Sequence, residues 1–168
     1  SDWERKPIGE ICQFETGDGL VAEDREGGDV PVYGAGGVIG GHNESLIDTP
    51  GIVTGSGGTI GEVSLADPGF WPIDTTYYVT PDQTSEDLRW LYYMLDVLDL
   101  SRVQSSSVIP QLSRDSIQSL YVPVPPADEQ DRIGEVLAEV DAVIDQLDDL
   151  KSEYETLKQG LMQRWQQK

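Results

Sequence analysis

The pattern of apolar and polar positions divides this chain into two parts. Up to about Val122, apolar residues occur in short runs typical of strands, at 51–54, 61–65 and 75–80. Glycine, proline and aspartate separate these runs and indicate turns. From Ile133 onward, apolar residues instead recur every seven positions, which indicates a long helix. The sequence therefore predicts an α+β fold of mixed or antiparallel strands with short helices, followed by one long coiled-coil helix.

One glycine pattern occurs twice in the first part. Residues 32–40 read VYGAGGVIG and residues 53–61 read VTGSGGTIG. Both have the spacing G-x-G-x-x-x-G, which differs from the dinucleotide-binding G-x-G-x-x-G, and neither carries the Lys-Ser/Thr of a P-loop. We interpret each copy as strand, glycine turn, strand, because glycine accommodates the positive φ that such turns require. We expect the two turns to place neighbouring loops at one edge of a sheet.

Two short helices are predicted within the first part. Residues 84–87 form a capping sequence for a helix over 88–95, whose Leu88, Leu91, Tyr92 and Leu95 share one face. Ser113 is a good N-cap for a second helix that runs through Ile117. The proline-rich residues 122–126 then indicate a hinge. We predict a first domain over 1–122, a proline hinge over 123–127 and a long helix over 128–168.

The long helix carries an apolar seam, a name used below for two heptad lines. The lines consist of Ile133, Val140, Leu147, Tyr154 and Leu161, and of Val136, Val143, Leu150 and Leu157. At 1.5 Å per residue the helix is roughly 60 Å long. An isolated helix cannot bury such a seam, so we expect it to pair. Folding back onto its own domain is the less favoured alternative, because the seam continues to the last turns.

The charges along this helix favour an antiparallel partner. Residues 128–149 hold nine acids and one base, whereas residues 150–168 hold two acids and four bases. A parallel pair would set the acidic half beside another acidic half, whereas an antiparallel pair sets it beside the basic half. The partner is either a helix of another protein or the same helix of a second copy.

The amino-acid composition limits which functions the chain can have. The 168 residues hold 31 acids and 11 bases, for a net charge of -20, and the acids are dispersed along the chain. This pattern favours a halophilic protein, in which salt screens self-repulsion, over an ordinary acidic protein. One cysteine and one histidine leave little material for a disulfide, a metal site or a catalytic centre, and we predict no metal, no cofactor and no catalytic residue. The lack of a signal-peptide pattern or a long apolar run predicts a cytoplasmic location.

Several motifs resemble the specificity (S) subunit of Type I restriction-modification systems. The run 122–133 (VPVPPADEQDRI) resembles the proline-proline, Glu-Gln, Arg-Ile signature of that family, and 157–162 (LKQGLM) is similar to the end of its conserved helix. The paired glycine strands resemble its target recognition domain, and Trp3-Glu4 with 8–11 resembles the entry to that domain. The resemblance covers nearly the whole chain.

The resemblance implies a non-catalytic DNA-reading subunit that binds methyltransferase (M) subunits and, through them, restriction (R) subunits. Family members carry two recognition domains and two long antiparallel helices, whereas this chain has one of each. It resembles half of an S subunit, and a second copy could supply the missing helix. Such a homodimer would read two identical half-sites, so that the target would be an inverted repeat with a gap set by the helix length.

The resemblance and the composition disagree on how DNA is held. Residues 1–127 have a net charge of -14, and so few cations give weak phosphate binding. We therefore expect recognition by a small cationic patch and polar loops, since arginine reads guanine and Asn or Gln reads adenine. The candidate DNA-binding residues are Tyr33, His42, Asn43, Ser56, Thr59, Thr76, Tyr78, Arg102, Ser105, Ser106, Ser107, Gln111 and Arg114.

Structural roles compete with DNA reading at several of these positions. His42 is also consistent with a solvated turn residue, and Arg114 with an ion-pair partner in the first turn of a helix. Since Tyr77 and Tyr78 alternate, one is expected in the core and the other on the surface. The serine run 105–107 is consistent with a simple loop, and the glycines with turn geometry.

Other functions fit the sequence less well. An interaction protein that binds the M subunit or other S subunits without DNA selectivity is the main alternative. An acidic DNA mimic is suggested by charge alone. An enzyme has the least support, because no nucleophile-base pair, metal cluster or methyl-donor motif is visible.

Overall fold

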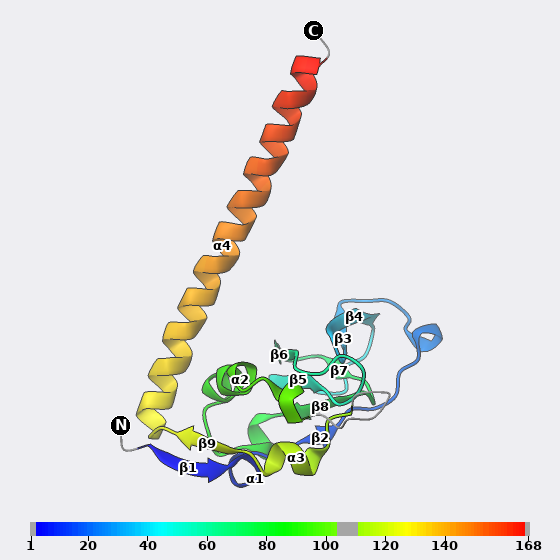
Figure 1. The fold of residues 1–168 in the computed structure, drawn as a ribbon. Coiled ribbons are helices and arrows are strands. Elements are labelled where there is room, and N and C mark those ends of the chain that lie inside the picture. Colours follow the sequence, from blue (N-terminus) through cyan, green and yellow to red (C-terminus); the bar gives the residue numbers. More distant parts are fainter. Residues whose placement is uncertain (1–2, 104–110, 167–168) are drawn as a thin grey trace.

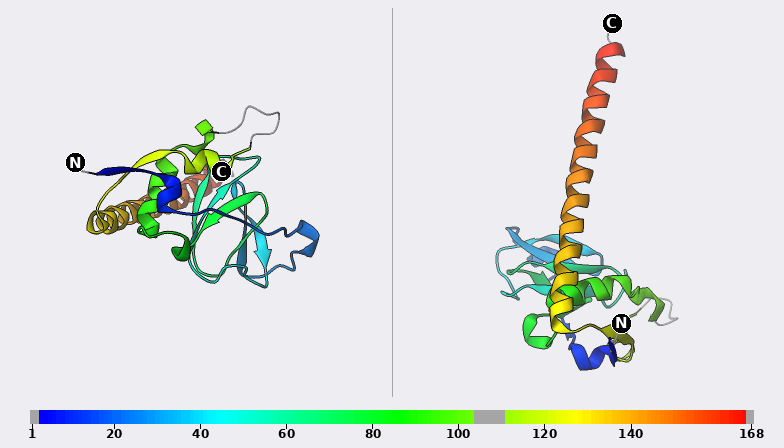
Figure 2. Two further views of the ribbon diagram at one scale, coloured as in Figure 1. Left: turned by 90° about the horizontal axis from the view of Figure 1, so that it is seen from below. Right: turned by 90° about the vertical axis from the view of Figure 1, so that its left-hand side faces the viewer.

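The structure is a computed structural model that describes residues 3–103 and 111–166. A small α+β domain lies at one end of a long straight helix, α4 (Ala127–Gln166), which projects far beyond the domain (Figure 1). The right-hand view of Figure 2 shows that most of this helix extends beyond the domain. The predicted fold class is confirmed, with short strands and helices followed by one long helix.

Three small sheets build the domain. The first pairs β1 (Glu4–Pro7) with β9 (Tyr121–Val124). The second has the order β2 (Glu15–Thr16), β8 (Thr76–Val79), β5 (Gly51–Gly55), β6 (Val63–Ala66), with every neighbouring pair antiparallel. The third has the order β4 (Gly37–His42), β3 (Val30–Gly34), β7 (Trp71–Pro72), in which β3 pairs antiparallel with β4 and parallel with β7. The strands are therefore mixed, as the sequence predicts.

Short helices connect and cover these sheets. The α-helices are α1 (Ile8–Ile11), α2 (Leu88–Val97) and α3 (Arg114–Gln118), and the 3-10 helices are η1 (Ala22–Asp24), η2 (Pro81–Gln83) and η3 (Leu100–Val103). The Asp87 side chain caps α2 by accepting a hydrogen bond from the backbone N–H of Trp90 at 2.7 Å. Helix α3 begins after Ser113 as predicted, but the Ser113 side chain makes no capping hydrogen bond.

Two apolar clusters form the core. The larger lies between α2 and the second sheet and includes Ile8, Ile52, Leu91 and Leu95. The smaller joins the second and third sheets around Val53, Ala66 and Phe70. The second sheet is therefore covered on both faces, which explains why all five residues of β5 are buried.

The two glycine copies form two hairpins, one in each of two sheets. Strands β3 and β4 pair around the first turn, and β5 and β6 pair across the second. The equivalent glycines Gly37 and Gly58 have φ values of 104° and 81°, which L-residues with a side chain rarely adopt. The expectation of one shared sheet edge is wrong, since the hairpins belong to different sheets. The turns are nevertheless close, because a Cβ on Gly55 would lie 2.8 Å from the carbonyl oxygen of Ala35.

The two ends of the domain are joined by β1 and β9. Their pairing runs from Glu4 opposite Val124 to Pro7 opposite Tyr121. Residues 123–127, predicted as a hinge, contribute the end of β9 and the first residue of α4. The division of the chain into two domains at these residues stays a prediction.

The seam of α4 is exposed along most of the helix. Ile133 packs against the larger core cluster, but the seam residues from Val136 to Leu161 are between 48% and 67% exposed. The alternative of a helix folded back onto its own domain is therefore wrong beyond the first turns. Among the described residues, no helix has a stretch long and apolar enough to cross a membrane.

Candidate nucleic-acid interface

A polar cluster forms where the loop after β5 meets the segment before α3. The backbone N–H of Leu112 donates to the carbonyl oxygen of Ser56 at 2.9 Å, and Gly57 pairs with Gln111 as an isolated bridge. The Tyr77 hydroxyl donates to the carbonyl oxygen of Leu112 at 3.1 Å. Together Ser56, Tyr77, Gln111, Leu112 and Ser113 line a surface cavity. Residues more than 50 positions apart in the chain thus present their polar groups side by side.

Arg114 lies at the rim of this cluster. Its guanidinium carbon is 5.5 Å from the centre of the Tyr77 ring, and its Nη2 donates to Thr16 Oγ1 at 2.7 Å. The interpretation of Arg114 as an ion-pair partner is wrong within the described part of the chain, where salt bridges join only Lys6 to Glu4 and Arg102 to Asp99. A guanidinium held by a ring and a hydroxyl keeps its charge available for an external acceptor.

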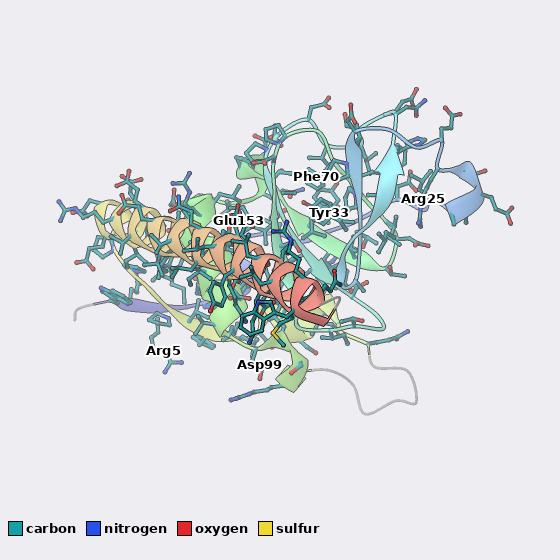
Figure 3. The ribbon with its side chains drawn as sticks, turned by 90° about the horizontal axis from the view of Figure 1, so that it is seen from above. Arg5, Arg25, Tyr33, Phe70, Asp99 and Glu153 are labelled. Carbon is teal, nitrogen blue, oxygen red and sulfur yellow. The ribbon has the colours of Figure 1, made fainter. Side chains whose placement is uncertain are left out.

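The two glycine turns lie close together in space. Thr59, in the turn after β5, is exposed, and its Oγ1 lies 3.7 Å from the position of a Cβ on Gly36 in the other turn. The exposed apolar residues Val38 and Ile39 follow on β4. Across the hairpin, Arg25 packs near Gly40 and donates from Nε and Nη2 to the carbonyl oxygen of Leu20 (Figure 3).

Three predicted residues on the strands pack against the core, of which Thr76 is buried and Tyr33 and Tyr78 are half-buried. Thr76 is fully buried and donates from Oγ1 to the carbonyl oxygen of Ile73 at 2.7 Å. Tyr33 meets Phe70 edge to face, with 5.8 Å between the ring centres, and Tyr78 packs on the same cluster. Figure 3 labels Tyr33 and Phe70 beside each other. Burial raises the pKa of both tyrosines, helped by the nearby carboxylates of Asp67 and Glu15 respectively.

The expectation that only one of Tyr77 and Tyr78 faces the core is wrong. Tyr77 packs against the larger apolar cluster and Tyr78 against the smaller one. Alternation along β8 does place the two rings on opposite faces of the sheet. Because both faces of this sheet are covered, each ring contacts apolar residues.

His42 and Asn43 end β4 in different surroundings. His42 is only 8% exposed, its ring meets Trp71 edge to face at 5.4 Å, and its Nδ1 accepts a hydrogen bond from the backbone N–H of Glu26 at 3.3 Å. The interpretation of His42 as a solvated turn residue is therefore wrong. Asn43 is exposed, and its side-chain amide donates to the Glu26 carboxylate.

The remaining candidates belong to the segment after α2. Arg102 lies in η3, and its Nε forms a 2.8 Å salt bridge with Asp99 Oδ2. Asp99 has a φ of 51°, and Ser101 and Arg102 hold the pKa of its carboxyl below the ordinary value. Ser105, Ser106 and Ser107 lie outside the described residues.

The structure adds three residues to the candidate interface, Thr16, Ser113 and Tyr77, whose ring faces Arg114. Thr16 contacts Arg114 across 98 positions of the sequence, and no signal in its neighbourhood pointed to it. Ser113 drew attention only as an N-cap, yet it lines the cavity. Within the described residues, no group of three His, Cys, Asp or Glu side chains is placed to hold a metal ion.

The comparisons agree with this architecture. The family model of the Type I restriction modification DNA specificity domain matches residues 1–156. The S subunit of the Type I restriction-modification system from M. genitalium has a similar fold, with a TM-score of 0.76, 21% identity, and coverage of 89% of this chain and 41% of that chain. The chain also resembles a structure of a type I R-M system complex, with a TM-score of 0.68 and 21% identity over 92% of this chain and 42% of that chain.

A third solved structure, the HsdS subunit from Thermoanaerobacter tengcongensis, has a TM-score of 0.61 and 20% identity over 86% of this chain and 39% of that chain. The chain thus spans about two fifths of the length of these three structures. No curated protein matches it.

The fold is a small domain with polar loops at the base of a long helix that is exposed over most of its length. The chain belongs to the family of Type I restriction modification DNA specificity domains, because the family model matches 156 of its 168 residues. Specificity subunits of this family are non-catalytic, and catalysis belongs to other subunits of the complex.

Proposed function

We propose that this chain reads DNA sequence for a Type I methyltransferase or restriction complex. The observation that carries the proposal is Arg114, whose guanidinium is held over Tyr77 at the rim of a polar cavity in a domain of the specificity family. Arginine in such a position can donate two hydrogen bonds to guanine. Gln111 and Ser56 lie beside it with groups that suit base edges or phosphates.

The wider DNA surface combines this cluster with the glycine turns and the flanking loops. We assign base or backbone contacts to Asn43, Thr59 and Arg102 in addition to the cluster. The serine run 105–107 ends four positions before Gln111 in the sequence and keeps its proposed role. Tyr33, His42, Thr76 and Tyr78 support the surface from within, since their side chains pack or donate inside the domain.

We further propose that the chain forms a homodimer through an antiparallel pair of α4 helices. The seam has small residues near the domain and large ones near the far end, and its near half is acidic. Ile133 is already used by its own domain, so the seam available for pairing begins at Val136. An antiparallel register that aligns the two heptad lines then matches a valine with a larger residue in three pairs, Val136 with Leu161, Val140 with Leu157 and Val143 with Tyr154 of the second copy, and pairs Leu147 with Leu150 at the centre.

Such a dimer presents two identical recognition domains related by a two-fold axis. Each domain would read one half-site, so the target is a bipartite inverted repeat. The partners are double-stranded DNA, the M subunits that carry out DNA methylation and, through them, the R subunits. The dispersed acids suit a complex that works in concentrated salt in the cytoplasm.

A selection from randomised duplexes tests the DNA-reading role. The protein is mixed with its methyltransferase subunit in molar salt, and bound duplexes are sequenced. We expect an inverted repeat, and Arg114→Ala to weaken binding of that repeat by about 10- to 100-fold. Arg5→Ala removes the same charge outside the proposed surface and is expected to change affinity little. Recovery of no motif would overturn the proposal.

Cysteine cross-linking tests the direction of the helix pair. We expect Val136→Cys mixed with Leu161→Cys to form a mixed disulfide, and neither variant to cross-link with itself. An in-register parallel pair predicts the reverse. The native Cys12 does not interfere, because it is buried and burial raises the pKa of its thiol to about 12.

The acidity of the domain favours a second candidate function. A protein with few cations can bind the M subunit or other S subunits without selecting DNA. In that case the selection returns no motif although the methyltransferase is still bound. A pull-down that measures both methyltransferase binding and DNA selectivity separates the two functions.

A further inference from the structure

The base of α4 is fixed to the domain by a buried side chain. Gln130 is only 2% exposed, and its Oε1 accepts a hydrogen bond from the backbone N–H of Asp87 at 2.9 Å. Its Nε2 donates to the carbonyl oxygen of Pro125 at 2.9 Å and to the Glu86 carboxylate. One amide therefore binds the start of α2, the end of the β9 segment and α4 together, with all of its hydrogen-bonding groups oriented.

One turn later, a glycine lets α4 approach α2 closely. A Cβ on Gly134 would lie 3.1 Å from Asp87 Oδ1, 3.2 Å from Arg89 Cβ and 3.3 Å from the backbone nitrogen of Trp90. Larger side chains have no room at this crossing unless one helix moves. The separation of α2 and α4 is thus set by a residue without a side chain.

Two further contacts fix the direction of the helix. Trp3 Nε1 donates to Glu129 Oε2 at 2.7 Å on the first turn, and the Tyr93 hydroxyl donates to Asp141 Oδ2 at 2.6 Å. Residues 129 and 141 lie about 18 Å apart along the helix axis. Contacts at two separated heights oppose tilting, which a single contact would allow.

We propose that this joint, formed by Gln130, Gly134 and the Tyr93–Asp141 pair, is a specificity determinant that sets the spacing between DNA half-sites. The proposal rests on the proposed function, in which paired α4 helices carry two reading domains. A tilt of about 10° at the joint moves a reading surface roughly 20 Å away by about 3.5 Å, which is one base-pair step. The angle of the joint, in addition to the length of α4, therefore selects the gap.

A pair of leucine substitutions on α4 tests the inference. Gly134→Leu forces α2 and α4 apart, whereas Ser152→Leu introduces the same residue at an exposed position on the side of the helix opposite the seam. Affinity is measured against duplexes whose half-sites are separated by a series of gaps, with the methyltransferase subunit present. We expect Gly134→Leu to shift the preferred gap by one or more base pairs or to broaden it, and Ser152→Leu to keep the gap of the unsubstituted protein.

A distance measurement reports on the joint without DNA. Spin labels at Leu65→Cys on the exposed side of β6 and Gln159→Cys on α4 are measured in chains diluted with unlabelled protein. We expect one narrow distance that Tyr93→Phe broadens and Gly134→Leu shifts. Tyr93→Phe retains the ring, so it remains informative even if Gly134→Leu fails to fold.

The outcomes separate this inference from the proposed function. A single preferred gap that both Gly134→Leu and Tyr93→Phe leave unchanged overturns the role of the joint while the DNA-reading function stands. A broad label distance in the unsubstituted protein also overturns it. Absence of any DNA selectivity in the unsubstituted protein overturns the proposed function and this inference together.

Discussion

The first turns of α4 are buried against the domain, whereas the rest of the same helix exposes its apolar seam. At the base, Gln130 and Gly134 are buried against α2, and Ile133 joins the domain core. Beyond Val136 the same heptad seam continues, yet its residues are exposed, up to 67% at Tyr154 and Leu157. Ile133 and the exposed seam residues beyond it fall on the same heptad lines, so periodicity alone does not say what covers each position.

The difference lies in what each region can reach. A domain of this size is much shorter than a roughly 60 Å helix, so it covers only the first few turns. The exposed remainder must find its apolar contacts elsewhere, and we propose a second copy as their source. The stability of the base should therefore be a property of one chain, whereas burial of the seam should depend on protein concentration.

The largest expected effect is loss of the helix pair on placing charge in the middle of the seam. Leu147→Glu removes an apolar contact worth about 1.5–3 kcal/mol on each chain of a symmetric pair, so dimer affinity should fall about 100-fold or more. Sedimentation in high salt measures the particle mass and so reports whether the dimer has dissociated. Ser152→Glu, on the opposite side of the helix, should leave the dimer intact, and a mass that both variants share would contradict the pairing.

A smaller effect separates the core from the seam by concentration. Leu95→Ala in the fully buried core should lower the free energy of unfolding by about 2–5 kcal/mol at any protein concentration. Leu157→Ala should destabilise the protein only where the helices are paired, with a shift that varies with dilution. Denaturant unfolding at two protein concentrations tests both variants. If the loss of stability depended on protein concentration in the same way for both, the contrast between core and seam would be wrong.

The buried amide at the base should matter to a lesser degree. Gln130→Ala leaves the Asp87 N–H and the Pro125 carbonyl without their side-chain partner, which should lower the free energy of unfolding by about 1–3 kcal/mol. Gln146→Ala on the exposed part of α4 should change it by less than about 0.5 kcal/mol. Thermal or denaturant unfolding measures the pair, and similar values for the two glutamines would contradict a structural role for Gln130.

The last expected effect appears only above pH 9, as a pH dependence that belongs to the domain core. Burial raises the pKa of the Cys12 thiol from 9.0 to about 12, so the folded state favours the protonated form. The contribution of the protonated thiol to the free energy of unfolding is fully present below pH 9 and is lost as the pH rises towards 12. The stability difference between the unsubstituted protein and Cys12→Ala should shrink over that range, and a constant difference would contradict it.

The sequence predicted best those features that depend only on residues close together in the chain. The helix over 88–95 followed from its capping sequence and apolar face, and the Asp87 cap is present. The glycine turns followed from the need for positive φ at Gly37 and Gly58. The exposed α4 seam was visible as a heptad, and the family was recognised from the proline-rich run and the helix after it.

The candidate site was predicted less well because it depends on contacts between distant segments. Thr16, Tyr77 and Arg114 meet through the pairing of β2 with β8 and the position of α3, and nothing local in the sequence encodes that meeting. His42 and Thr76 have polar side chains suited to binding, yet their hydrogen bonds are satisfied within the domain.

By itself, the sequence determined the two kinds of region in this protein, a domain of short strands with glycine turns and a long helix with an apolar seam, because propensity and periodicity act over a few residues. Only the tertiary structure decided that the two hairpins belong to different sheets, that Arg114 stacks on Tyr77, and that Gln130 and Gly134 fix the helix to the domain. Those features depend on which distant surfaces fit together, and the packing of side chains in three dimensions settles that fit.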